Sequence, residues 1–384
     1  MAVDKNLMKK LLKLDGAVLR NYDPYQYVIE PSSPSLGYTF DNTWGVPFGY
    51  TLLLWGEQKG GKSLVARMLM GDLHKSDPDA VALYYNTEMR EELQATPRQL
   101  KMFGVDPDRM VAYDTNQPTE IFDPIENEVP KLIAEGLKIK LIVIDSLTDI
   151  LGRKMINAAS VGNQLMGDNA STVGDGLNRI KATLRRHKIA CVLVAQARAE
   201  FDQHEQMRGK KIKMAAAFAV KHKAEYFMLV EHLKTAEGKK DLLGNNFYDK
   251  NIENVMSSTK DSEYDVTGRK IRCTMEQSSC GRDGRTAIFT LHKDRGLINT
   301  NEEIFLLGEG NFHVIEQPTQ GRFKFGDRQW HGKEAILEAL AQDSQLRKDV
   351  LAACKRIDLA RREQEPPMLA DSVEHTDPLP EGAL

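Results

Sequence analysis

The stretch that decides the fold of this chain is Gly56-Glu57-Gln58-Lys59-Gly60-Gly61-Lys62-Ser63, which fits the phosphate-binding pattern G-x-x-x-x-G-K-[ST]. Residues 50–55 precede it and have the apolar character of a short buried strand. Residues 64–75 follow it with apolar side chains at helical spacing. A strand, a glycine-rich turn and a helix N-terminus together form a nest of backbone N–H groups that holds a polyphosphate. We therefore expect this chain to bind a nucleoside triphosphate.

Two side chains in this stretch have separate expected roles. Lys62 would reach the β- and γ-phosphates, and the Ser63 hydroxyl would ligate Mg²⁺. The other residues would surround the phosphates chiefly with backbone N–H groups; they are Gly56, Glu57, Gln58, Lys59, Gly60, Gly61 and Leu64.

Length and composition bound the class of protein. The chain has 384 residues, of which 41% are hydrophobic, which is enough for one large α/β domain with appendages or for two domains. Its four cysteines show no paired spacing, so we expect reduced thiols in a cytoplasmic protein. The sequence has no long apolar run and no apolar segment typical of a secretory signal, which predicts neither a membrane span nor export.

The net charge of −3 conceals an asymmetry between the last residues and the rest of the chain. Residues 363–384 contain six acidic side chains and no Lys or Arg, so the first 362 residues carry a net charge of +3. With its prolines, this segment is typical of a disordered acidic tail. Two interpretations stay open, namely a tail that aids solubility and a tail that competes with nucleic acid for basic surface.

Strand and helix patterns alternate along the middle of the chain. Near-continuous apolar strands such as residues 141–144 indicate a parallel sheet that is covered on both faces, with ligands at the carboxyl ends of its strands. The expected strands are 51–55, 81–86, 110–113, 140–145, 189–195 and 226–233, and the expected helices are 62–75, 97–103, 121–136 and 170–187.

The periphery of this core is less regular. Residues 4–20 predict a short amphipathic helix, whose apolar stripe needs a cover from its own domain or from a neighbouring subunit. Strands resume at 269–276 and 286–292, and one or two small helices are expected at 332–357. The resulting division is 1–34 (helix and linker), 35–316 (core, with a polar insertion at about 235–268), 317–362 (small helical region) and 363–384 (acidic tail).

Carboxylates follow two of the expected strands. Asp145 ends the apolar strand of residues 140–145, where a carboxylate can hold Mg²⁺ opposite Ser63. Glu88 follows the strand of residues 81–86, where a carboxylate can orient and deprotonate water for hydrolysis. The alternatives are a helix cap for Asp145 and an ordinary surface position for Glu88.

Gln196 and Arg198 follow the expected strand of residues 189–195. A glutamine at this point could sense the γ-phosphate and transmit its presence to the segment that follows. That segment is basic, and a second irregular segment, 153–171, leaves the same edge of the sheet. Two such loops beside a nucleotide suit a grip on a phosphate backbone, although a solvated charge run is the alternative. The basic side chains concerned are Arg198, Arg208, Lys210, Lys211 and Lys213.

With these motifs in order, the sequence resembles the RecA-type recombinase family, and most closely the phage UvsX-like recombinases. The resemblance covers roughly residues 30–315, and the motif of residues 96–109 is particularly close to the UvsX-like pattern. The other matching segments are 36–49, 78–88, 145–147 and 195–198.

The resemblance implies a RecA-like P-loop ATPase core and a DNA-dependent ATPase that acts in recombination and repair. ATP and Mg²⁺ are the implied cofactors, and ATP would lie between adjacent subunits of a helical filament. The filament would form on single-stranded DNA and pair it with a homologous duplex, with the segments 153–171 and 199–218 as DNA-binding loops. A single-strand-binding protein and a loading mediator are the implied further partners, and a phage origin would place the protein in the cytoplasm of a bacterial host.

Four further residues gain a role only through the resemblance. Arg282 or Arg285 could reach the γ-phosphate of a neighbouring subunit and stabilise the transferring phosphoryl group. Their alternative is a basic hairpin turn. Arg98 and Gln99 fall where the family holds the nucleotide base, but Gln99 replaces the usual stacking tyrosine, which leaves adenine specificity open.

Two other functions share the same core. A ring-forming motor, such as a DnaB-type helicase or a RadA-like protein, usually adds a sizeable N-terminal domain or a zinc module, and neither is visible before the phosphate-binding stretch. A filament-forming DNA-binding protein with a vestigial ATPase is the second alternative. The intact set of Lys62, Ser63, Glu88 and Asp145 argues against it.

Overall fold

The structure is a computed structural model of the whole chain. It describes residues 27–89, 96–156, 168–199, 212–214, 220, 222–233, 268–279, 281–292 and 296–363. The chain divides into two compact units, Met1–Leu306 and Leu307–Leu384, which are described separately below.

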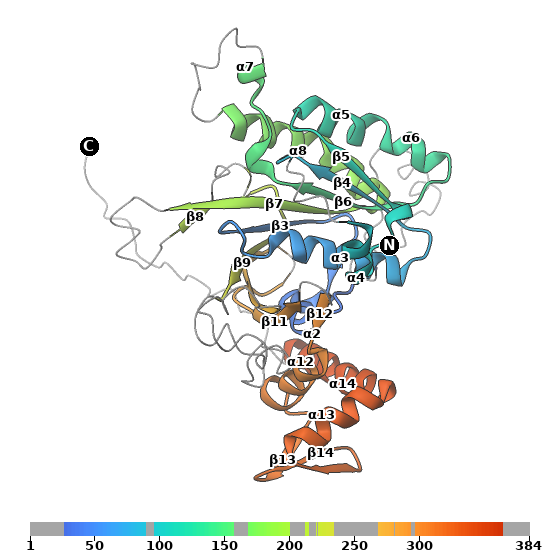
Figure 1. Cartoon of the computed structure of the whole chain (residues 1–384), viewed down its shortest axis with the longest axis vertical. Coiled ribbons are helices and arrows are strands. Elements are labelled where there is room, and N and C mark those ends of the chain that lie inside the picture. Colours follow the sequence, from blue (N-terminus) through green and yellow to red (C-terminus); the bar gives the residue numbers. More distant parts are fainter. Residues whose placement is uncertain are drawn as a thin grey trace, which may run out of the picture. The chain divides into compact units, whose positions relative to one another are not determined.

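A ten-stranded sheet forms the core of the first unit, in the order β12-β11-β10-β9-β3-β7-β6-β4-β5, with β8 paired to β7 (Figure 1). The strands from β5 to β9 in this order are parallel, whereas β10, β11 and β12 extend the sheet antiparallel. This confirms the predicted α/β class with a mostly parallel sheet. The strands are β3 (Thr51–Gly56), β4 (Val81–Asn86), β5 (Met110–Asp114), β6 (Ile139–Asp145), β7 (Ala190–Ala199), β8 (Ile212–Met214), β9 (Tyr226–His232), β10 (Gly268–Ser278), β11 (Thr286–His292) and β12 (Gly296–Ile298).

Helices cover both faces of this sheet, as the continuous apolar strands predict (Figure 1). Leu52 and Leu54 of β3 belong to the core cluster on the α3 face, whereas Leu53 belongs to the cluster beneath α5 and α8. The helices are α2 (Pro34–Thr39), α3 (Lys62–Ser76), α4 (Pro97–Met102), α5 (Pro118–Asn127), α6 (Val129–Ala134), α7 (Arg153–Ile156), α8 (Asp168–His187) and α12 (Thr300–Leu306). Short 3₁₀ turns η1 (Asp41–Thr43), η3 (Pro107–Arg109) and η4 (Leu147–Asp149) and the strand pair β1 (Val28–Ile29) and β2 (Val46–Pro47) complete the unit.

Two predicted elements differ from the structure. The helix expected at 121–136 is two helices, α5 and α6, because Pro130 lacks the N–H that a continuous helix requires and instead lies in the first turn of α6. The strand expected to end at residue 195 continues to Ala199, because β8 pairs with its extension. Gln196 therefore lies inside β7 and not after it.

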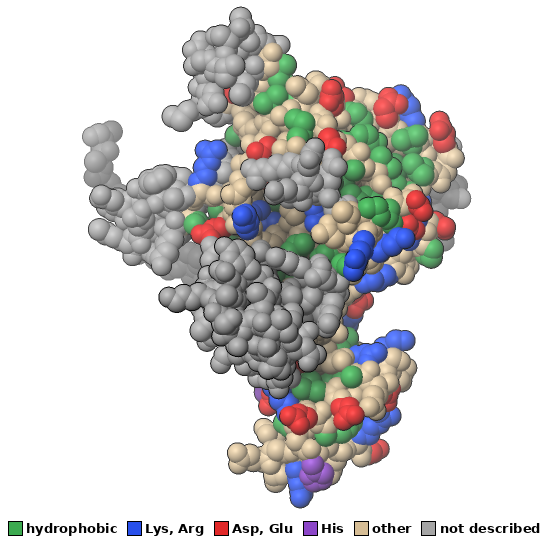
Figure 2. All heavy atoms as spheres, in the orientation of Figure 1, with side chains coloured by type: hydrophobic (Ala, Val, Ile, Leu, Met, Phe, Trp, Pro, Cys, Tyr) green, Lys and Arg blue, Asp and Glu red, His purple; other side chains and the backbone are tan. Residues whose placement is uncertain are grey.

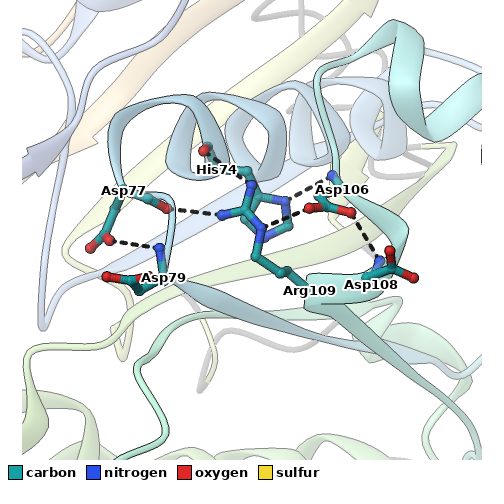
Figure 3. Close-up of polar contacts among 6 residues, drawn as sticks. All are labelled: His74, Asp77, Asp79, Asp106, Asp108 and Arg109. Atoms are coloured by element: carbon teal, nitrogen blue, oxygen red, sulfur yellow. Dashed lines mark hydrogen bonds and ion pairs between the residues drawn. The ribbon is translucent and has the colours of Figure 1, made fainter.

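Arg109 fastens the end of α3 to the segment that leads into β5 (Figure 3). Its guanidinium donates to the carbonyl oxygens of His74 (3.3 Å) and Asp77 (3.0 Å) at the C-terminus of α3, and it pairs with Asp106 at 2.9 Å. A cation at the last carbonyls of a helix completes hydrogen bonds that the helix itself leaves open. His74 adds a second link, since its Nδ1 accepts from the Asp106 N–H at 3.0 Å. Burial, and then the Arg109 charge, lower the pKa of His74, so the ring stays neutral in this role.

The second unit contains a three-stranded antiparallel sheet in the order β13-β14-β15 and two helices. The sequence predicts only the helices. The strands are four residues long and mostly exposed, so they lack the alternating apolar pattern of a half-buried strand. The elements are the π-helical turn η7 (Leu307–Asn311), β13 (Glu316–Thr319), β14 (Arg322–Phe325), β15 (Arg328–His331), α13 (Lys333–Gln342) and α14 (Ser344–Glu363).

Several predicted segments lie outside the described residues. They are the N-terminal helix of residues 4–20, most of the segments 153–171 and 199–218, most of the polar insertion at about 235–268, and all but one residue of the acidic tail. The sequence predicts that the core ends at residue 316, whereas the division into compact units falls after Leu306. The predicted boundary stays a prediction. Within the described part of the chain, no helix is long and apolar enough to cross a membrane.

Candidate nucleotide-binding site

The phosphate-binding stretch forms a turn between β3 and α3, as the sequence predicts. Gly56 ends β3 and Gly61 precedes the first residue of α3, with φ angles of 152° and 106°. A Cβ atom on Gly56 would lie 2.2 Å from the Val230 carbonyl oxygen, and one on Gly61 would lie 2.7 Å from the Ile271 side chain. The turn is thus packed closely against β9 and β10, which only glycine permits. Such a cradle, with the free N–H groups of the first turn of α3, fits a polyphosphate.

Lys62 lies at the base of this turn with only 7% of its surface exposed. Its ammonium donates to the carbonyl oxygens of Gly56 at 3.0 Å and Glu57 at 2.7 Å. These bonds use two of its three donors and leave the third for a ligand oxygen. Burial lowers the pKa of Lys62, and the charges of Asp145 and Glu88 act in the opposite direction. The cation is therefore held next to two carboxylates in a partly desolvated place, which suits a phosphate contact.

Asp145 ends β6 and is 2% exposed. Its carboxylate accepts a hydrogen bond of 2.8 Å from the hydroxyl of Tyr84 on the neighbouring strand β4. Burial, and then the Asp145 charge, raise the pKa of Tyr84 well above its usual value, so this hydroxyl remains a donor. Tyr84 is a site residue that the sequence analysis missed, although a tyrosine in the middle of a buried strand is a signal for a buried hydrogen bond.

The donor set at this edge fits Mg²⁺ better than a metal that needs several protein ligands. Ser63, at the start of α3, and Asp145 offer one hydroxyl and one carboxylate, and magnesium in nucleotide sites uses one or two such groups beside phosphate oxygens and water. Among the described residues, no group of three His, Cys, Asp or Glu side chains could hold a metal by itself.

Glu88 and Gln196 were predicted separately, and the structure brings them together. Glu88 follows β4 and Gln196 lies in β7, with β6 between the two strands. The Gln196 side-chain amide donates to Glu88 Oε1, with 2.5 Å between nitrogen and oxygen. Gln196 also faces Gly56 in the register of β7 with β3. The pair therefore lies beside the phosphate-binding turn, and its roles as a water-orienting carboxylate and a phosphate sensor stay predictions.

The turn η4 after β6 adds three polar residues that the sequence analysis did not assign. The Ser146 hydroxyl lies 2.7 Å from the Thr148 hydroxyl and donates to Asp149 Oδ2 at 2.5 Å. The backbone N–H of Gln196 points to Thr148 Oγ1 at 3.4 Å, and its side-chain amide lies 3.5 Å from Asp149 Oδ2. In the sequence, the polar residues after Asp145 have the pattern of a helix cap. That local pattern gives no indication that they contact the distant strand β7.

Thr87 locks the end of β4 to the end of β6. Its hydroxyl donates to the Ser146 carbonyl oxygen at 2.5 Å and accepts from the Ser146 N–H at 2.7 Å, while its own N–H donates to the Asp145 carbonyl oxygen at 2.9 Å. With 1% exposure, Thr87 makes these bonds away from water. They fix the backbone of Glu88 relative to Asp145.

Arg98 and Gln99 lie exposed at the start of α4. The Gln99 side-chain carbonyl accepts from the Thr96 N–H at 3.1 Å, and the Thr96 hydroxyl accepts from the Gln99 N–H at 3.3 Å. This reciprocal pair is a capping box. Capping of α4 is a structural role for Gln99 that does not depend on a nucleotide base. The base contacts of both residues stay predictions.

Arg282 and Arg285 lie in the turn between β10 and β11. β10 runs antiparallel to β9, with Ser278 opposite Tyr226, and Tyr226 pairs with Leu52 near the start of β3. The turn therefore lies at the opposite end of the strands from Gly56. The Arg285 guanidinium, 10% exposed, pairs with buried Asp41 at 2.7 Å and donates to the Tyr38 carbonyl oxygen at 3.0 Å. The backbone N–H of Arg282 donates to the same aspartate at 3.1 Å. Contact of either arginine with a phosphate in a neighbouring subunit stays a prediction.

Of the predicted DNA-binding residues, Arg198 is exposed on the extension of β7, where its backbone is in register with Lys213 of β8. Arg208, Lys210 and Lys211 lie outside the described residues. Basic and acidic side chains are interspersed over the described part of the face in Figure 2. The basic path therefore stays a prediction from the sequence.

Comparison with known proteins connects this arrangement with one family. No family model matches the chain. Proteins named RecA are similar to it at 23% identity in Mycoplasma mobile, over 40% of this chain and 43% of that protein, and at 21% in Clostridium acetobutylicum, over 58% and 60%. The chain thus spans about half the length of these two relatives. RecA of Mycoplasma pneumoniae is 22% identical over 79% of each chain. Together with the fold, these matches support a distant relationship of this chain to the RecA family.

Proposed function

We propose that this chain is a DNA-dependent ATPase that forms filaments on single-stranded DNA and catalyses homologous pairing and strand exchange. The observation that carries the proposal is the convergence of Lys62, Asp145, Glu88 and Gln196 at one edge of the sheet. The relationship to RecA proteins supports the recombinase form of this function over other uses of the same core.

The phosphate end of ATP would lie on the turn between β3 and α3. Lys62 would donate to the β- and γ-phosphates, and the backbone N–H groups of the turn would bind the remaining oxygens. Ser63 and Asp145 would hold Mg²⁺, which supplies charge neutralisation on the transferring phosphoryl group. The Tyr84 hydroxyl keeps the Asp145 carboxylate oriented toward this task.

Glu88 would accept the proton of the attacking water. In the structure one of its oxygens accepts from the Gln196 amide. When Gln196 turns to donate to the γ-phosphate, this oxygen can accept from water instead, so that sensing of the γ-phosphate prepares Glu88 for catalysis. This gives Gln196 a role as a switch as well as a phosphate ligand.

The DNA path would follow the segments beyond β7 and η4. The proposed contacts are side chains of residues 198–213 together with segment 153–171. The filament would use the N-terminal helix of residues 4–20 against a neighbouring core. The likeness to UvsX-like recombinases rests on residues 96–109. The proposed bacterial host, single-strand-binding protein and loading mediator depend on the same likeness.

The test is ATP hydrolysis with and without single-stranded DNA, with the same samples imaged by negative-stain electron microscopy. Turnover stimulated by DNA together with helical filaments is the expected result. Closed rings on the same DNA would indicate a ring-forming motor instead. Filaments without turnover, in protein that binds ATP, would indicate a DNA-binding protein with a vestigial ATPase.

A further inference from the structure

The Gln196 side-chain amide lies between two carboxylates. Its nitrogen is 2.5 Å from Glu88 Oε1 and 3.5 Å from Asp149 Oδ2. An amide nitrogen carries two hydrogens, so it can donate to both acids at once. Glu88 and Asp149 belong to different elements, the end of β4 and the turn η4, and the Gln196 side chain contacts both acids.

The position of Asp149 is itself fixed by its turn. Its N–H donates to the Ser146 carbonyl oxygen at 3.2 Å, and its Oδ2 accepts from the Ser146 hydroxyl at 2.5 Å. Ser146 is fully buried and held in turn by Thr87. Hydrogen bonds to a buried residue therefore hold the Asp149 carboxylate in its position beside Gln196.

We propose that Asp149 is a positioning residue that holds Gln196 in its resting orientation on Glu88. The inference rests on the proposed ATPase function and assigns a residue beyond it. Gln196 must leave both acids to reach a phosphate, so the hydrogen bond to Asp149 adds to the free energy that this movement costs. Asp149 thereby restrains hydrolysis until a second event, such as DNA binding, shifts the turn.

The turn has a direct connection to the segment that would carry such a signal. The carbonyl oxygen of Ile150, the residue after Asp149, accepts a hydrogen bond from the Asn169 side chain in α8. The Arg153 N–H donates to the Thr172 hydroxyl, also in α8, at 3.1 Å. Asp149 therefore lies between Gln196 and both ends of segment 153–171. A displacement of Arg153 or Asn169, in the described ends of the segment, is transmitted to the residues around Asp149 through these bonds.

The test compares Asp149→Ala, Gln196→Ala and the double variant in the full-length chain. The measurements are kcat and KM for ATP without DNA, kcat with single-stranded DNA, and the affinity for a fluorescent ADP analogue. For Asp149→Ala we expect a DNA-free kcat about fivefold above wild type, since one hydrogen bond to a charged group is lost. KM and ADP affinity should stay within about twofold, and the stimulation by DNA should fall by the same factor as the DNA-free kcat rises.

The double variant separates this role from a structural one. Adding Asp149→Ala to Gln196→Ala should change kcat no further, because Asp149 acts only through Gln196. Asp149→Asn keeps an oxygen that accepts from the amide, so it should restore most of the wild-type restraint. If the alanine variant does not fold, the asparagine variant serves in the same cycle, with a smaller increase that again vanishes without Gln196.

Glu135→Gln, which removes a carboxylate at the end of α6, is the control for the change in net charge. An unchanged or lowered DNA-free kcat in Asp149→Ala, or a fivefold increase that persists without Gln196, overturns the inference and leaves the ATPase function standing. A wild-type chain that binds the ADP analogue but never hydrolyses ATP overturns both.

Discussion

Tyr84 donates a 2.8 Å hydrogen bond to the Asp145 carboxylate across neighbouring strands of the buried sheet. Tyr84→Phe would remove this donor from a carboxylate that is only 2% exposed. We expect the free energy of unfolding to fall by about 1–3 kcal/mol, measured by urea denaturation. Tyr113→Phe, on a tyrosine with 42% exposure, should change it by less than about 0.5 kcal/mol. Equal effects of the two substitutions would contradict a special role for the Tyr84 hydroxyl.

Lys62→Ala should abolish tight nucleotide binding. The variant loses a buried ammonium that is held at the phosphate-binding turn, and we expect the affinity for a fluorescent ATP analogue to fall at least about 100-fold. Lys59→Ala, on an exposed lysine of the same turn, is the matched control and should retain affinity within about threefold. Similar losses in both variants would assign the effect to the overall charge of the turn.

Glu88→Gln should separate binding from hydrolysis. The amide keeps the shape of the side chain but is a poor proton acceptor, so kcat should fall by about 10² to 10⁴ while nucleotide affinity stays within a few-fold. Glu57→Gln, an exposed glutamate in the phosphate-binding turn, should leave kcat close to wild type. Hydrolysis by Glu88→Gln at the wild-type rate would remove Glu88 from the catalytic role.

Arg285→Met should destabilise the first unit strongly. Asp41 is 1% exposed, and without Arg285 its buried carboxylate would lose an ion pair of 2.7 Å. Losing one partner of such a pair costs about 3–5 kcal/mol, measurable by urea denaturation. The double variant Asp41→Asn with Arg285→Met should recover part of the loss, because the buried charge is gone. Lys131→Met breaks an exposed pair with Glu128 and should cost less than about 1 kcal/mol.

Glu303 should make stability depend on pH. Burial raises the pKa of this carboxyl from 4.5 to about 8, with the Ser33 hydroxyl and the Ser35 N–H acting against the shift. The folded state therefore favours the protonated acid. Its contribution to stability is fully present below pH 4.5 and is lost as the pH rises through about 8. Denaturation midpoints should fall across this window, and Glu303→Gln should flatten that fall. A slope that is the same in the variant would assign it to other groups.

The sequence predicts the central sheet well because its strands carry their own signal. Residues 141–144 are apolar without alternation, as both faces of β6 are covered, and the phosphate-binding stretch fixes where β3 ends and α3 begins. The rule that ligands bind at the carboxyl ends of parallel strands singles out Asp145, Glu88 and Gln196 in the sequence, although β7 continues past Gln196 to Ala199. No local signal exists for β13 to β15, since their side chains are mostly exposed.

The contacts within the site are harder to predict than its members. Glu88 and Gln196 are 108 residues apart, and their hydrogen bond depends on which strand lies between β4 and β7. The same holds for Asp41 and Arg285, whose ion pair joins the start of the described chain to a distant hairpin. The order of residues in the sequence indicates which segments are buried and where the chain turns. The Glu88–Gln196 hydrogen bond and the Asp41–Arg285 ion pair depend instead on the order and register of the strands.

The continuation of β7 through Gln196 to Ala199 has a mechanical consequence. Gln196 and Arg198 are two residues apart on one extended strand, so their side chains leave the same face about 7 Å from each other. A paired strand resists bending, and β8 stiffens this one beyond Gln196. Gln196 and the exposed Arg198 are therefore held at a fixed spacing. A shift of the strand along its axis would displace both residues by the same amount, so that a movement at one of them also moves the other.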